Sequence, residues 1–168
     1  NIVANQPTAF EGHSQGVLGV EIARAWINGD EARAATVFAI ARLIGAAAAR
    51  VTRRARAPHA GDATYMVSVR GVSDALLTRI VESLPSTSHP LSIALRNDTD
   101  THVVSGAPND LASLVAAIER AAAQDKAAHD AHERGGRPLA PVCEYLPVYV
   151  PFHSPMLADA LALVDEWA

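Results

Sequence analysis

A serine lies between two glycines near the start of the chain, in the stretch G-H-S-Q-G from Gly12 to Gly16. The pattern fits G-x-S-x-G, the nucleophile elbow, in which a strand enters a tight turn and a helix leaves it. Ser14 would then sit at a helix N-terminus, where the N–H of Gln15 can point at an oxyanion. The pattern predicts a nucleophilic serine; the alternative is a serine in an ordinary tight turn.

A serine nucleophile needs a general base, and the chain has seven histidines. His153 stands between two prolines in P-F-H-S-P-M-L, and prolines stiffen a loop and fix where a side chain points. We therefore expect His153 to be the base of Ser14. His13 is adjacent to the serine and should point away from it as a packing residue. The other histidines are expected in loops, at a strand start, or in an H-x-x-H pair too small for a metal site: His59, His89, His102, His129 and His132.

The elements around Ser14 follow from local pattern. We expect a short strand over Pro7 to Glu11, then a helix over Val17 to Trp26. Asp30 is the expected N-cap of a second helix. The apolar stripe of this second helix has helical spacing and comprises Val37, Ala41, Ile44, Ala48 and Val51. A linker is expected over Thr52 to Asp62.

The middle of the chain predicts a β-α-β-β-α-β order, the ferredoxin-like split unit. The expected strands are Thr64 to Arg70, Leu91 to Asn97, His102 to Gly106 and Val142 to Val150, and the expected helices are Ser73 to Leu84 and Asn109 to about Gln124. Ser73 and Asn109 are the expected N-caps. Asp125 to Pro138 is polar and charged, so we expect a surface loop or a frayed helix end there.

Composition limits the class of protein. The chain has 168 residues, of which 49% are hydrophobic and 19% charged, so it is long enough to bury a globular core. A formal net charge of −4 argues against nucleic acid or an anionic membrane as the main partner. The single cysteine, Cys143, excludes an internal disulfide and favours a reducing, cytoplasmic location. We expect no segment apolar enough to span a bilayer and see no signal peptide.

Three stretches together carry a resemblance to a known family. They are G-H-S-Q-G, R-N-D-T-D-T-H-V-V-S-G and V-P-F-H-S-P-M-L. The chain resembles the malonyl/acyl-CoA:ACP transacylase superfamily, and most of all the acetyl-type acyltransferase domains of bacterial and fungal type I fatty acid synthases. The likeness runs from Gln6 to about Leu163. The resemblance implies an α/β fold, with part of an α/β-hydrolase-like lobe over residues 1–57 and 151–168 and a ferredoxin-like subdomain over 63–150.

The resemblance also implies a function. It implies transfer of an acyl group from coenzyme A, through an ester on Ser14 with His153 as base, to the phosphopantetheine thiol of an acyl carrier domain. No tightly bound cofactor and no metal are implied; coenzyme A enters as a substrate thioester. The implied partners are the carrier and the other fatty acid synthase domains of the same polypeptide, with no nucleic acid and no membrane. The family also places an asparagine near the cleft, which Asn97 would match.

The expected acyl group is acetyl. Malonyl-type members hold the substrate carboxylate with an arginine in an Arg-Gly pair after the elbow, and the matching pair here is Ile44-Gly45. We expect Ile44 to face inward with the apolar stripe. Arg42 lies two residues earlier, about 200° around the helix, and should point elsewhere. An apolar side chain cannot partner a carboxylate.

Other readings stay open at this point. A thioesterase or lipase-like hydrolase shares G-x-S-x-G, although the expected subdomain between Ser14 and His153 disfavours it, and no acidic triad member is recognisable before the histidine. A malonyl- or palmitoyl-type transacylase and a non-catalytic scaffold lobe are further alternatives. The family's upstream Gly-Gln-Gly oxyanion loop and downstream partner of the histidine are absent from this sequence, so we expect it to be a piece of a larger domain.

Overall fold

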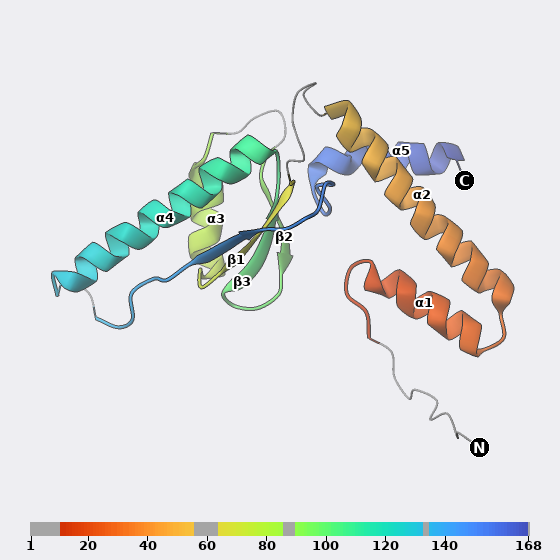
Figure 1. The fold of residues 1–168 in the computed structure, drawn as a ribbon, viewed down its shortest axis with the longest axis horizontal. Coiled ribbons are helices and arrows are strands. Elements are labelled where there is room, and N and C mark those ends of the chain that lie inside the picture. The colour runs from red at the N-terminus through yellow and green to blue at the C-terminus, as the bar shows by residue number, and fades with distance from the viewer. Residues whose placement is uncertain (1–10, 56–63, 86–89, 133–134, 168) are drawn as a thin grey trace, which may run out of the picture.

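The computed structural model describes residues 11–55, 64–85, 90–132 and 135–167 (Figure 1). Two groups of elements emerge from it, which we name the sheet unit (β1 to β4 with α3 and α4, residues 66–145) and the helical unit (α1, α2 and α5). The elements are α1 (Gly16–Ile27), α2 (Glu31–Ala55), β1 (Met66–Arg70), α3 (Asp74–Ser83), β2 (Ser92–Arg96), β3 (Thr101–Ser105), α4 (Pro108–Asp130), β4 (Val142–Tyr145), the short 3-10 helix η1 (Pro155–Leu157) and α5 (Ala158–Trp167).

The sheet unit has the predicted β-α-β-β-α-β order of elements. Its four strands run in the order β2-β3-β1-β4, and every neighbouring pair is antiparallel. Residues alternate between the two faces of a strand, so Val67 and Val69 of β1 share a face with Val104 of β3. This face packs against α3 and α4, and the buried cluster between them includes Leu77, Leu111, Leu114 and Ile118.

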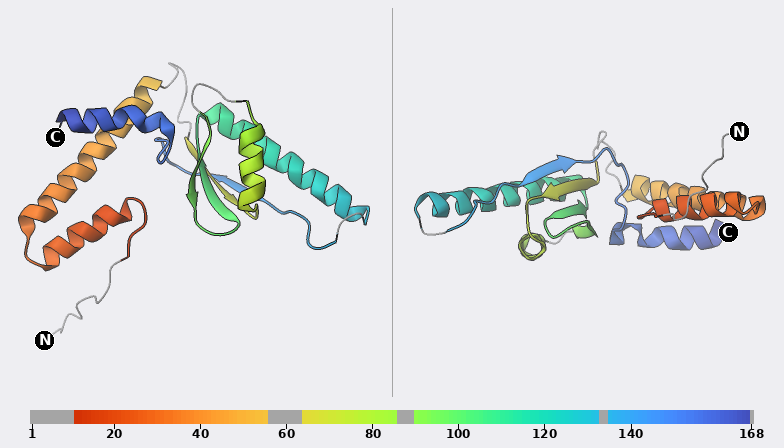
Figure 2. Two further views of the ribbon diagram at one scale, coloured as in Figure 1. Left: turned by 180° about the vertical axis from the view of Figure 1, so that it is seen from behind. Right: turned by 90° about the horizontal axis from the view of Figure 1, so that it is seen from below.

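The helical unit has a smaller buried cluster than the sheet unit. Helix α2 packs against α1 along its N-terminal half and against α5 along its C-terminal half (Figures 1 and 2). The second contact buries Ala47, Val51 and Ala160. The guanidinium of Arg50 also lies over the ring of Trp167, 5.7 Å from its centroid. No strand occurs in the described part of this unit, so the expected hydrolase-like lobe is not seen here; the expected strand over residues 7–11 lies almost wholly outside the described residues.

Several predicted boundaries are wrong. Helix α4 begins at Pro108 after Ala107, because proline at the first helical position already has a helical φ; Asn109 is not its N-cap. The helix continues to Asp130, since its alanine-rich end favours helix and Lys126 Nζ pairs with Asp130 Oδ2 at 2.5 Å. The predicted surface loop from Asp125 is therefore helical over its first residues.

Two further boundaries differ from those expected. Strand β4 ends at Tyr145 rather than Val150. Pro147 follows two residues later and has no N–H to donate to a strand neighbour. Helix α2 runs to Ala55, so the predicted linker does not begin at Thr52; the hydroxyl of Thr52 instead donates to the carbonyl of Ala48 within the helix.

Helix α2 bears on the expectation that no segment is apolar enough to span a bilayer. Over Glu31–Arg54 it is long and apolar enough, by length and composition, to cross a bilayer. The expectation that no segment meets this test was wrong. Length and composition are weak evidence for a membrane span, and here α2 contacts both α1 and α5.

Candidate active site

The turn at Ser14 has the strained geometry of an elbow. Ser14 has φ 54°, in the left-handed region, where a residue with a side chain is disfavoured by about 1–2 kcal/mol. Gly12 permits the turn, since a Cβ on it would lie 2.5 Å from the carbonyl carbon of Gly16. Gly16 itself has open space around it, so the close approach depends on the first glycine only. The Ser14 side chain is exposed and open to a substrate.

Helix α1 leaves the turn directly. Gln15 is its N-cap residue, and the first backbone bonds run from Gly16 N to His13 O at 2.9 Å and from Val17 N to Ser14 O at 3.1 Å. Among the described residues, no backbone hydrogen bond engages the N–H of Gln15. This N–H is therefore available to an oxyanion formed at Ser14, at the positive end of the helix.

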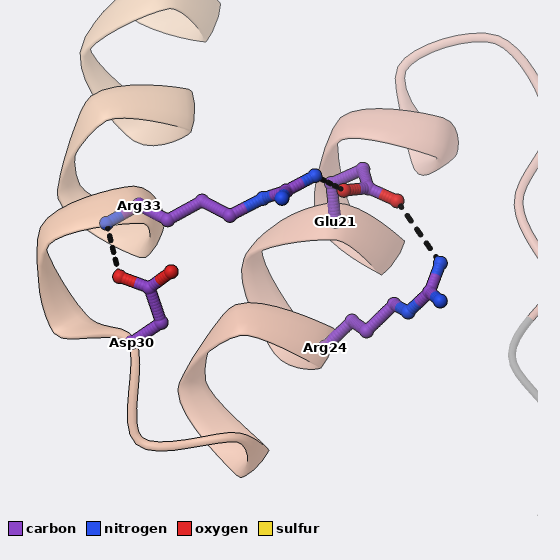
Figure 3. Close-up of polar contacts among 4 residues, drawn as sticks. All are labelled: Glu21, Arg24, Asp30 and Arg33. Atoms are coloured by element: carbon purple, nitrogen blue, oxygen red, sulfur yellow. Dashed lines mark hydrogen bonds and ion pairs between the residues drawn. The ribbon is translucent and has the colours of Figure 1, made fainter.

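One ion pair joins α1 to α2, and a second ion pair and a helix cap lie beside it (Figure 3). Arg33 of α2 donates to Glu21 of α1 at 2.8 Å, and Arg24 lies 3.7 Å from the same carboxylate. The predicted cap is confirmed: Asp30 Oδ1 accepts from the backbone N–H of Arg33 at 3.0 Å. Of these contacts, the Arg33–Glu21 pair is the one that links α2 to α1.

His153 lies against Ser14 across 139 residues of sequence. Its Nε2 is 2.7 Å from Ser14 Oγ, within the range of a strong hydrogen bond. His153 has φ 55°, so both members of the pair adopt a backbone conformation that is rare outside glycine. Among the described residues only His132 shares this property. Such strain, at two residues that meet, is typical of functional sites.

The loop around His153 is anchored on both sides. Pro151 and Met156 are buried. The hydroxyl of Ser154 accepts from the backbone N–H of Met156 at 3.2 Å and so caps η1. On the side of the sheet unit, the hydroxyl of Ser92 donates to the carbonyl oxygen of His153 at 3.4 Å. Local pattern could not have indicated Ser92, because this contact joins residues 61 positions apart in the chain.

None of the other histidines that the structure describes is hydrogen-bonded to Ser14. His13 is exposed, so the prediction that it packs is wrong. His102 is fully buried on the helix-facing side of β3, and its Nε2 donates to Val72 O at 3.1 Å. His129 and His132 hydrogen-bond to main-chain carbonyls, and within the described residues no group of three or more His, Cys, Asp or Glu could hold a metal. His59 and His89 lie outside the described residues.

Cys143 is the other potential nucleophile of the chain. It is half-buried in β4 and packs against the core of the sheet unit. Burial raises the pKa of its thiol, and the negative charge of Glu119 raises it further. A raised pKa leaves little thiolate at neutral pH, so Cys143 is a poor competitor of Ser14.

The structure does not bring Asn97 or Ile44 to the pair. Asn97 lies at the hairpin turn, and its backbone N–H donates to Thr101 O at 2.9 Å. It is five residues from Ser92 along an extended chain, or about 16 Å. Ile44 is 40% exposed, so the expectation that it faces inward is wrong for the described residues.

Comparisons with known proteins show what the chain is similar to. The model of a family described as the fatty acid synthase central AT domain matches residues 65–145, which is the sheet unit. The fatty acid synthase subunit beta of Aspergillus oryzae is 36% identical over 112 residues, 63% of this chain. A crystal structure of the acyltransferase domain of the iterative polyketide synthase in enediyne biosynthesis matches with a TM-score of 0.57 and 25% identity, and covers 92% of this chain.

The chain is thus similar to the fatty acid synthase central AT domain over its sheet unit, and to part of an acyltransferase domain over most of its length. It spans 5% of the length of the Aspergillus subunit and 32% of the polyketide synthase chain. The family match covers the sheet unit and contains neither Ser14 nor His153, whereas the structural match extends over 92% of this chain.

Proposed function

We propose that this acyltransferase domain transfers an acetyl group from coenzyme A, through an ester on Ser14, to the phosphopantetheine thiol of an acyl carrier domain. The observation that carries the proposal is the 2.7 Å contact between Ser14 Oγ and His153 Nε2, with the serine at a helix N-terminus. A serine at its ordinary pKa is a weak nucleophile, and an adjacent imidazole is the usual activator.

The first half-reaction loads the serine. His153 Nε2 accepts the proton of Ser14 as Oγ attacks the thioester carbonyl carbon. The N–H of Gln15 donates to the oxyanion of the tetrahedral intermediate. When the intermediate collapses, the carbon–sulfur bond breaks, and His153 returns its proton to the departing thiolate of coenzyme A. The serine is left as an ester and the imidazole is neutral again.

The second half-reaction transfers the acyl group from Ser14 to the carrier. His153 accepts a proton from the phosphopantetheine thiol, and the resulting thiolate attacks the ester carbonyl. The carbon–oxygen bond breaks, and Ser14 takes back the proton from His153. The covalent ester divides one transfer between two thiols into two steps of a ping-pong reaction. The chain's own residues supply nucleophile, base and one oxyanion donor, so no tightly bound cofactor takes part.

Acetyl is proposed as the acyl group because the chain offers no cation at the matching position. Ile44 stands where malonyl-type relatives carry an arginine, and Arg42 is two residues away on another side of α2. Asn97, which the resemblance places near the cleft, is proposed to contribute to substrate binding. We further propose that an acyl carrier domain and other fatty acid synthase domains of the same polypeptide are its partners, and that the protein is cytoplasmic.

Labelled acetyl-CoA tests the proposal in the full-length protein. We expect a mass increase of one acetyl group on the peptide that contains Ser14, and transfer of the label to a phosphopantetheine thiol added afterwards. Ser14→Ala removes the nucleophile and should abolish the label. Release of free acetate without transfer would indicate a hydrolase, label on Cys143 would exclude the serine ester, and no reaction at all would indicate a scaffold.

A further inference from the structure

The backbone at His153 is strained and must be held by its surroundings. Its φ of 55° lies in a region that non-glycine residues occupy only when neighbouring contacts compensate. The contacts of Pro151, Ser154 and Met156 act on the residues beside it. The carbonyl group of His153 itself is contacted by one side chain in the described part of the chain, the hydroxyl of Ser92 at 3.4 Å.

We propose that Ser92 is a positioning residue, whose hydroxyl holds the His153 peptide so that the imidazole points at Ser14. This inference rests on the proposed function, because it assigns Ser92 to the same reaction. Ser92 begins β2 and therefore belongs to the sheet unit, whereas Ser14 lies in the turn that precedes α1 of the helical unit. The hydrogen bond thus fixes the base relative to a rigid sheet and does not depend on the loop alone.

The direction of the imidazole follows from the backbone that carries it. A rotation of the His153 peptide displaces Nε2 at the end of the side chain, and a misplacement of about 1 Å in a catalytic group can cost up to about a hundredfold in rate. The Ser92 contact is longer than a strong O–H···O bond, which measures about 2.5–3.0 Å. The loop also keeps its other anchors. We therefore expect a loss of about three- to tenfold when the hydroxyl is removed.

The sheet offers a matched control. Ser105 is the direct cross-strand partner of Ser92 on β3. Its hydroxyl is fully buried and has no hydrogen-bond partner among the described residues. Ser105→Ala therefore removes the same chemical group from the same place in the sheet without removing a bond. Replacing a buried hydroxyl that has no partner by a methyl group should not destabilise the strand pair.

The first measurement is the single-turnover rate of Ser14 acylation in the full-length protein, over a range of acetyl-CoA concentrations. Ser92→Ala should lower the maximal rate about three- to tenfold and leave the half-saturating concentration within about twofold. Ser92→Thr keeps the hydroxyl, suits a strand and should stay within about twofold of wild type. Ser105→Ala should equal wild type. Failure of threonine to rescue the rate, or an equal loss in Ser105→Ala, overturns the proposal.

The second measurement does not depend on acyl transfer. Diethyl pyrocarbonate modifies exposed imidazoles, and mass spectrometry gives the rate of modification at each histidine. Ser92→Ala should release His153 from Ser14 Oγ and raise its rate at least twofold, while the exposed His132 serves as an internal reference. An unchanged rate at His153 overturns the positioning role. If wild type does not acylate Ser14, the proposed function fails, and this rate still decides for or against Ser92.

Discussion

Large aliphatic side chains fill the sheet unit, whereas the helical unit is held by small ones. The cluster between the strands and α3 and α4 includes Leu77, Leu111 and Leu114, all fully buried. The buried residues between α2 and α5 are Ala47, Val51 and Ala160, and the larger side chains packed against them, such as Trp167, are only partly buried. Trp26 and Phe38 among others remain exposed in this unit. Ser14 nevertheless begins a helix of the helical unit and meets His153 in the segment between the two units. Stability and chemistry are therefore located in different parts of the molecule.

The largest effect should come from a change at the Ser14–His153 pair, and it should appear in the acylation rate. His153→Ala removes the proton acceptor of Ser14 and should slow acylation by about two to four orders of magnitude, as expected for a positioned general base. Hydrogen-exchange protection of β1 and β3 should not change, because His153 is exposed and outside the sheet unit's core. Acylation rates and hydrogen-exchange rates measured on the same preparation check both expectations, the slower chemistry and the unchanged sheet.

His13→Ala is the control for this change. His13 is also exposed and adjacent to Ser14, but its side chain has no hydrogen bond to the serine within the described residues. We expect at most a severalfold loss, through the shape of the turn. Equal losses at His13 and His153 would mean that the base has been wrongly assigned.

The contrast between the units also explains what could be predicted from sequence. Val67, Val69 and Val104 alternate along their strands, and Leu111, Leu114 and Ile118 recur at helical spacing, so local periodicity alone indicated the sheet unit. Ser73, which was predicted as the cap of α3, accepts from Leu76 N at 3.4 Å. The elbow and the histidine loop were found through motifs, because two glycines and two prolines restrict the backbone in recognisable ways.

What failed depends on contacts between distant parts of the chain. The pattern of α2 placed Ile44 on a buried stripe, but burial depends on which neighbouring helix reaches that turn. Asn97 was placed by resemblance, and its distance from Ser92 along β2 became visible only with the register of the hairpin. The end of α4 was missed because polar residues were taken as loop, although alanine propensity and the Lys126–Asp130 pair favour helix.

Stability can be separated from chemistry by a change in the core of the sheet unit. Leu114 is fully buried between α4 and the sheet, so Leu114→Ala leaves a cavity and should lower the free energy of unfolding by about 2–5 kcal/mol. Leu161→Ala makes the same change on α5 at a side chain that is 73% exposed, and should cost less than about 0.5 kcal/mol. Denaturant unfolding of both variants measures the difference.

The acylation rate of Leu114→Ala tests whether stability and chemistry are separate. At a temperature where Leu114→Ala remains folded, its acylation rate should stay within about threefold of wild type. A loss comparable to that of His153→Ala would show that the sheet unit positions the pair far more tightly than one hydrogen bond from Ser92 implies.

A smaller effect is expected on acyl selectivity. Ile44→Arg places a cation where malonyl-type relatives have one, and should shift the ratio of malonyl to acetyl loading upward by about tenfold, or about 1.4 kcal/mol. The exposure of Ile44 keeps the effect modest, because a charge pair that water reaches is weakened. Competition between the two thioesters gives the ratio directly. Efficient malonyl loading by wild type would exclude the acetyl assignment, and Arg42→Ala would then show whether Arg42 binds the carboxylate.

The smallest effect tests whether charge or packing holds the helical unit. Arg33→Ala removes the ion pair with Glu21 but keeps the backbone N–H that Asp30 caps (Figure 3). The Arg33 side chain is 61% exposed, so water and salt screen the pair. We expect a loss of at most about 1 kcal/mol in the free energy of unfolding, smaller still at high salt. Arg42→Ala on the same helix, where no ion pair forms within the described residues, should cost nothing measurable. A loss of several kcal/mol at Arg33 would mean that the angle of the elbow helix depends on one exposed carboxylate, and the helical unit would then be held by charge where the sheet unit is held by its core.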